Sequence, residues 1–210
     1  MNKFLALIFL AFFLDIANAA PPKPSTAFQE AFKDHTSRVL AGNKDLAPLI
    51  ADLRQIVLSG DPVAQFMLAS LIGSTEPEAA ISLLQKSYEG GCAGAAGVLG
   101  ALVGARNLVE AQSWFIRAAN AGDAPSQLVV AGLHERGKGL ARSKAAAVAW
   151  AKLARSQTYN QGVTMAADEY LANLAPTLTS AEMAEAEQMW AVLQRDHPKQ
   201  PPYLCGQSAP

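Results

Sequence analysis

Small and apolar residues recur along this chain with a period of 31 residues, which begins at Gly60, Gly91 and Gly122. Further small or apolar residues follow each glycine at the same distances, four, eight, nine and eleven positions on. They are Ala64, Leu68, Ala69 and Leu71 in the first unit, Ala95, Leu99, Gly100 and Leu102 in the second, and Ser126, Val130, Ala131 and Leu133 in the third. Spacings of three and four residues belong to one face of an α-helix. A fixed period of this length predicts stacked helical hairpins.

The second half of each unit aligns when it is counted back from the end of the unit. Trp114 and Trp150 stand at matching positions, and an alanine lies three residues before each of them. The third unit is longer because Gly137-Lys138-Gly139-Leu140 extends its internal turn. Both tryptophans occupy a core position of the repeat, so we expect both to be buried. The three units are 60–90, 91–121 and 122–155.

These residues resemble the pattern of the Sel1-like repeats. The match lies in Gly137-Lys138-Gly139-Leu140 followed by Ala147 and Trp150, and in Trp114 followed by Arg117-Ala118-Ala119. It covers about 96 of the 210 residues. The resemblance implies an all-α fold, a right-handed α-solenoid of stacked antiparallel helix hairpins. It also implies a role in protein–protein contacts.

The segments outside the repeats have other patterns. Two helices, over about 26–40 and 46–59, are predicted to form a capping pair, and the leader before them is predicted to be mobile; together they make up 20–59. Repeat arrays need such atypical ends, because an inner repeat leaves an apolar face open. Residues 156–196 are predicted as C-terminal capping helices, and 197–210 as an irregular tail.

Residues 1–19 have the pattern of a secretory signal peptide. Lys3 precedes an apolar run of 11 residues, 4–14, and Ala17-Asn18-Ala19 is a small-x-small cleavage site. The run is shorter than the ~18 apolar residues that a membrane span requires. We therefore expect cleavage near Ala19 and Ala20, export to the periplasm or the medium, and no membrane span in the mature chain.

The first predicted helix of the middle unit carries Gly94, Gly97, Gly100 and Gly104. Each glycine inside a helix costs about 0.5–1 kcal/mol relative to alanine. A dinucleotide-binding loop needs a preceding strand and another glycine order, and the apolar run is too short for a membrane helix pair. Close packing against a neighbouring helix is therefore the compensation that we expect.

Charge and chemical motifs exclude several function classes. The formal net charge is −1 and 17 % of the residues are charged, so nothing favours binding of nucleic acid or an anionic membrane surface. His35, His134 and His197 are scattered, without cysteine or carboxylate neighbours at metal-ligand spacing. Motifs for nucleophilic catalysis or phosphate binding are missing. We assign no catalytic residue, no metal ligand and no cofactor.

The two cysteines, Cys92 and Cys205, lie 113 residues apart in the sequence. In an oxidising compartment two cysteines often pair. The alternative is one buried thiol and one exposed thiol, because pairing geometry cannot be obtained from sequence. Both alternatives stay open at this point.

A partner site is predicted on the first helix of each repeat, which we expect to line the concave surface of the solenoid. Amides and small residues between the core positions would point into this groove, and a polar group would lie at one rim. The predicted partner-binding residues are Gln65, Ser70, Gln127, His134, Glu135 and Arg136. The predicted function is an exported, non-catalytic interaction module or adaptor in the cell envelope, whose partner is another protein or a peptide. Two alternatives are a secreted cell-wall or β-lactam hydrolase, which would need a clustered nucleophile and base, and a periplasmic regulator or assembly scaffold.

Overall fold

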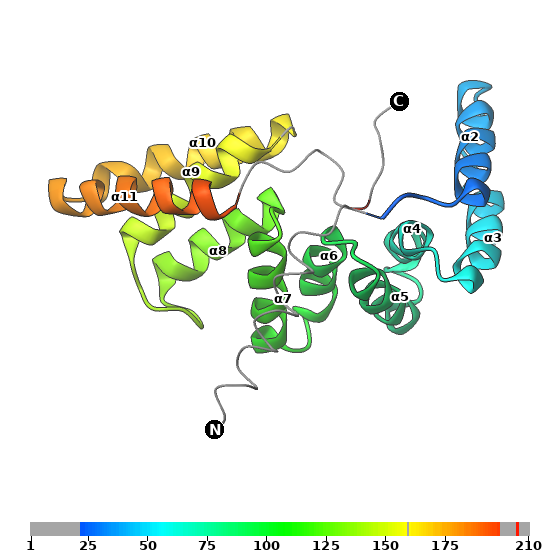
Figure 1. Cartoon of the computed structure of the whole chain (residues 1–210), viewed down its shortest axis with the longest axis horizontal. Helices are drawn as coiled ribbons and strands as arrows, with labels where there is room; N and C mark the ends of the chain where they lie inside the picture. Colours follow the sequence, from blue (N-terminus) through cyan, green and yellow to red (C-terminus); the bar gives the residue numbers. More distant parts are fainter. Residues whose placement is uncertain (1–21, 159, 198–204, 206–210) are drawn as a thin grey trace.

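The computed structural model describes residues 22–158, 160–197 and 205. In these residues the backbone forms ten α-helices, two short 3-10 helices and no strand, which confirms the predicted all-α fold. The helices follow one another along an arc, from α2 at one side to α10 and α11 at the other (Figure 1). None of the described helices is long and apolar enough to cross a membrane. The predicted signal peptide and most of the predicted tail lie outside the described residues.

The N-terminal cap consists of α2 (Thr26–Leu40), α3 (Ala47–Ile56) and the short helix η1 (Val57–Ser59). The Ser25 hydroxyl accepts a hydrogen bond from the Phe28 amide at 3.2 Å and so caps α2. The backbone just before α2 is joined to the first repeat, because the Ser25 amide donates to Asp61 Oδ2 at 2.8 Å.

Three antiparallel helix hairpins follow, as the repeat period predicts. Consecutive helices pack against one another. The pairs are α4 (Pro62–Ile72) with α5 (Pro77–Glu89), α6 (Gly94–Val103) with α7 (Leu108–Asn120), and α8 (Ala124–Arg136) with α9 (Lys144–Gln157).

Backbone conformation explains the glycine that opens each repeat. Gly60, Gly91 and Gly122 have φ angles of +82°, +92° and +92°. This left-handed region is strained for residues with a Cβ atom and free for glycine. The reversal that it produces ends one hairpin and starts the next. The period of the sequence is therefore the period of this backbone turn.

An aspartate caps the first helix of two of the pairs. Asp61 accepts hydrogen bonds from the amides of Val63 and Ala64 at 2.8 and 3.0 Å. Asp123 accepts one from the Ser126 amide at 3.0 Å and another from the Ser126 hydroxyl. Both side chains are buried.

The pKa values of the two capping carboxylates nevertheless shift in opposite directions. Burial acts to raise the pKa of Asp61, but hydrogen bonds from Ser25, Ala64 and Val63 outweigh it, so the pKa lies below its ordinary value. Burial dominates at Asp123 and raises its pKa, against the hydrogen bonds from Ser126. Two causes act together: burial penalises the charged form more at Asp123, and three separate backbone amides hold Asp61, whereas a single residue holds Asp123.

The glycine-rich helix α6 packs closely against its neighbours, as predicted. A Cβ atom on Gly97 would lie 2.9 Å from Asp123 Oδ2 and 3.0 Å from Ser126 Oγ, at the start of α8. A Cβ on Gly100 would lie 3.0 Å from the Phe115 ring of α7. Side chains at these two positions would therefore push the neighbouring helices away.

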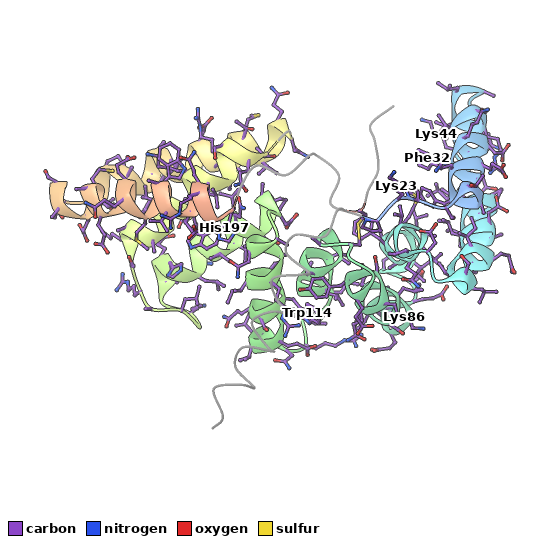
Figure 2. The ribbon with its side chains drawn as sticks, in the orientation of Figure 1. Lys23, Phe32, Lys44, Lys86, Trp114 and His197 are labelled. Carbon is purple, nitrogen blue, oxygen red and sulfur yellow. A yellow bond between two sulfur atoms is a disulfide. The ribbon has the colours of Figure 1, made fainter. Side chains whose placement is uncertain are left out.

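The prediction that Trp114 and Trp150 are buried is wrong, because both are only partly buried. Trp114 lies edge-on against Tyr88, with ring centroids 5.5 Å apart, and the Arg117 guanidinium lies 4.7 Å from its ring centroid (Figure 2). Such a position joins two hairpins at their surface. The fully buried positions are held by smaller residues instead, such as Leu84, Leu99 and Leu153.

The C-terminal cap is built on the alanine-rich helix α9. It consists of α10 (Gln161–Leu174), the short helix η2 (Ala175–Thr177) and α11 (Ser180–Asp196). Thr179 and Glu182 form a capping box at the start of α11. Both α10 and α11 pack against α9, and they form a second apolar cluster with it. Its buried members are Ala145, Ala147, Val148, Leu174 and Ala186.

The two cysteines form a disulfide, which decides between the two alternatives that the sequence left open. The Cα atoms of Cys92 and Cys205 are 4.5 Å apart, and both residues are buried in the core of the first two hairpins. Cys92 lies just before α6. The bond therefore ties the C-terminal part of the chain to the middle of the solenoid.

Candidate partner-binding site

The two predicted amides, Gln65 and Gln127, do not edge a groove. Gln65 is 5 % exposed and Gln127 is 0 % exposed. Gln127 Nε2 donates to Gln157 Oε1 at 2.8 Å and to the Ala119 carbonyl at 3.3 Å. A polar group buried in this way needs partners inside the protein, and Gln127 finds them on α7 and α9. The middle repeat has Ala96 at the same position, and this alanine is fully buried. A small apolar residue at this repeat position was the signal in the sequence that the position lies in the interior.

The second predicted row, Ser70 and its repeat equivalents, is partly open. Ser70 and Ala101 are exposed on α4 and α6, whereas Gly132, which follows 31 residues later, is buried. A Cβ atom on Gly132 would lie 2.8 Å from Arg136 Nη2. The guanidinium of Arg136 thus occupies the space that a side chain would fill at the third position. The row therefore runs from a hydroxyl and a methyl group to an exposed cation.

The predicted rim residues His134, Glu135 and Arg136 lie at the end of α8 and are held by different elements. His134 Nδ1 lies 3.0 Å from the Ala141 carbonyl oxygen, which ties the end of α8 to the long turn before α9. Glu135 Oε2 accepts a hydrogen bond from the Tyr170 hydroxyl of α10 at 2.8 Å. The Glu135 carbonyl accepts another from Arg142 Nε at 3.2 Å.

Tyr170 is a member of this cluster that the sequence did not reveal. Burial raises the pKa of Tyr170, and the hydrogen bond and charge of Glu135 raise it further. The phenol therefore stays protonated and keeps donating to Glu135. It lies 35 residues from Glu135 in the sequence and on a capping helix, so no local pattern connects the two. Because Tyr170 holds the Glu135 carboxylate, Arg136 is the exposed charged group among the three rim residues.

A second set of contacts holds His197 at the junction of the last repeats. His197 Nδ1 lies 3.0 Å from the Asn120 carbonyl oxygen, and its own carbonyl accepts a hydrogen bond from Gln157 Nε2. Its ring centroid is 5.7 Å from that of Trp150 (Figure 2). These contacts fasten the end of α11 to α7 and α9, and they give His197 a packing role.

The described residues contain no group of three or more histidine, cysteine or acidic side chains placed to hold a metal ion. Ser70 and Ala101 lie exposed at equivalent positions of the first helices α4 and α6, and Arg136 lies exposed at the end of α8.

No protein-family model and no curated protein matches this chain. The solved structures that resemble it include the following two. One is a protective antigen of uropathogenic Escherichia coli strains that displays an SLR fold, with a TM-score of 0.56, 20 % identity, 83 % of this chain covered and 49 % of that chain. The other is a Sel1 repeat protein from Oxalobacter formigenes, with a TM-score of 0.60, 20 % identity, 79 % of this chain covered and 71 % of that chain. The chain thus spans about half the length of the first. Its fold is the α-solenoid of Sel1-like repeat proteins, as predicted.

Proposed function

We propose that this chain is an exported Sel1-like repeat protein that binds another protein or a peptide in the cell envelope, as an adaptor without catalytic activity. The observation that supports this proposal most directly is the row formed by Ser70, Ala101 and Arg136. Stacked repeats present extended surfaces of this kind to their partners. The apolar segment 4–14 and the small-x-small site after it support export.

The chemistry of the row suits a polypeptide ligand. Small side chains let a peptide backbone approach the helices closely, and an arginine can hold a carboxylate or a carbonyl oxygen through its fork of N–H donors. Arg136 lies against the bare backbone of Gly132, and its neighbour Glu135 is held by Tyr170. The row can therefore orient its ligand through the Arg136 guanidinium.

Two double variants test the row. Ser70→Arg with Ala101→Arg places bulk and charge on the first helices. Ser82→Arg with Ser113→Arg is the matched control, because these serines are exposed at equivalent positions of the second helices α5 and α7. The immobilised mature chain, from Ala20 onward, is used to capture partners from an envelope fraction of the source cells.

We expect the first double variant to lose the captured protein and the control to retain it. Both should melt like the parent, because all four positions are exposed and surface changes usually alter stability by less than about 0.5 kcal/mol. Capture that survives Ser70→Arg with Ala101→Arg but is lost in the control would refute the row and place the site on the second helices.

A further inference from the structure

Ion pairs join the α4–α5 turn and the start of α5 to the elements before and after them, and the second repeat lacks the equivalent acid. Arg54 pairs with Glu76, and Arg106 pairs with Glu78. The residue of the second repeat that corresponds to Glu78, 31 positions on, is Val109. An aliphatic side chain thus stands where the first repeat has the acid of its ion pair.

This valine and its neighbour are among the most exposed large apolar side chains that the structure describes. Leu108 is 59 % exposed and Val109 is 76 % exposed, at the first turn of α7. Single exposed apolar residues are ordinary on protein surfaces. An adjacent pair that replaces an ion-pairing position has no structural purpose in the hairpin itself.

The most cationic segment of the chain lies at the end of α8 and in the turn that follows it. Residues 136–144 contain four lysines and arginines and no acid, although the whole chain has a net charge of −1. Within the described part of the chain none of the four takes part in an ion pair. Lys144 donates to the Thr177 carbonyl and hydroxyl, and Arg142 donates to the Glu135 carbonyl. Lys138 and Arg136 are exposed.

Packing places the turn that carries Lys138 against α7. Gly139 has φ +74°, and a Cβ atom there would overlap the side-chain amide of Gln112 on α7. Gln112 lies three residues after Val109 and four after Leu108, so the three share one face of the helix. The long turn between α8 and α9 therefore rests on the α7 face that carries Leu108 and Val109. We define the loop edge as Leu108, Val109, Gln112 and Lys138, which combines two exposed apolar side chains with an exposed cation.

The geometry points to a second docking surface: the loop edge binds an acidic segment of a partner protein that also carries apolar side chains. A carboxylate of the segment pairs with Lys138, and the apolar side chains of the segment cover Leu108 and Val109. Charge selects the partner, and the covered apolar area holds it. This surface lies on the loops between the helices, apart from the row of Ser70, Ala101 and Arg136.

An anionic membrane would meet the same charges. The edge offers a lipid surface only two aliphatic side chains and no aromatic one, whereas stable membrane binding needs a larger apolar face or a lipid anchor. The same two side chains are enough to bind a short acidic peptide, because a few central residues contribute most of the binding energy of a protein interface.

The test uses the full mature chain and a short fluorescein-labelled peptide in which glutamate alternates with leucine, followed by fluorescence anisotropy. Val109→Glu supplies the residue that the first repeat carries at this position, so the fold has already shown that it accepts it. Lys138→Glu removes the exposed cation. Met165→Glu is the matched control, because Met165 is an apolar residue of α10 with 64 % exposure and receives the same charge.

We expect Val109→Glu and Lys138→Glu each to weaken peptide binding about tenfold. Met165→Glu should leave the affinity for the peptide unchanged, and added salt should weaken peptide binding by the parent. Ser70→Arg with Ala101→Arg should bind the peptide like the parent, which separates this surface from the proposed row. Equal weakening by Met165→Glu, or equal binding of a peptide with serine in place of leucine, would overturn the proposal. So would a dimer of the parent that Val109→Glu dissociates, or co-sedimentation with phosphatidylserine vesicles in place of peptide binding.

Discussion

Gly97, inside α6, and Gly104, the C-cap of that helix, should respond to alanine with opposite signs. Gly97 and Gly104 both have helical backbone conformations in one glycine-rich segment, so propensity alone predicts that alanine stabilises each by about 0.5–1 kcal/mol. Their surroundings differ. At Gly104 the new Cβ would lie 3.7 Å from Ala111 Cβ and 3.1 Å from the Gly100 carbonyl oxygen of its own helix. At Gly97 it would lie 2.9 Å from Asp123 Oδ2 and 3.0 Å from Ser126 Oγ.

The contact at Gly97 involves the cap of the next helix. Asp123 must move if the methyl group is to fit, and it then loses its hydrogen bonds to Ser126. Loss of an aspartate cap costs about 0.5–2 kcal/mol, and an unpaired buried polar group costs about 1–3 kcal/mol. After the propensity gain is subtracted, Gly97→Ala should destabilise the protein by about 1–3 kcal/mol. For a chain of this length that lowers Tm by about 3–9 °C.

The measurement is thermal and urea denaturation of the oxidised mature protein, followed by circular dichroism. Gly104→Ala should raise the midpoint slightly, and Gly97→Ala should lower it. A double-mutant cycle adds Asp123→Ala: with the carboxylate gone, Gly97→Ala should become nearly neutral. Gly97→Ala at or above parental stability would show that contact with α8 is not the reason for the glycine.

Two further predictions concern the capping aspartates and the disulfide. The pKa of Asp61 is lowered in the folded state, so its stabilising contribution is present above the unfolded value of 3.8 and is lost as the pH falls through the folded value. The pKa of Asp123 is raised, so its contribution is present below 3.8 and is lost as the pH rises through the folded value. The free-energy cost of Asp61→Asn should therefore grow from acid to neutral pH and that of Asp123→Asn should shrink, as urea denaturation across this range would show; parallel curves would contradict both assignments. Cys92→Ala with Cys205→Ser removes a bond between residues 113 apart, which should cost up to about 4–5 kcal/mol in the unfolding free energy, and a cost below about 1 kcal/mol would show that the bond does not constrain the unfolded chain.

The sequence determined those features that depend on neighbouring residues. Gly60, Gly91 and Gly122 recur because a left-handed turn must recur, and this requirement can be recognised from spacing alone. The caps at Ser25 and Thr179 each accept a hydrogen bond from an amide three residues later. These caps can therefore also be predicted from residues that are close in the sequence. Helix number, helix order and the solenoid fold followed from such signals.

Only the tertiary structure decided which side chains face outward and which distant groups meet. Gln127 lies inside because the amide of Gln157, 30 residues away, is there to receive it. Glu135 is held by Tyr170, and Cys92 by Cys205, over 35 and 113 residues. A helical period identifies a face of one helix, but the neighbouring hairpin decides whether that face is covered. For this reason the fold could be predicted from repeated local patterns, whereas the binding surfaces needed the packing of the hairpins.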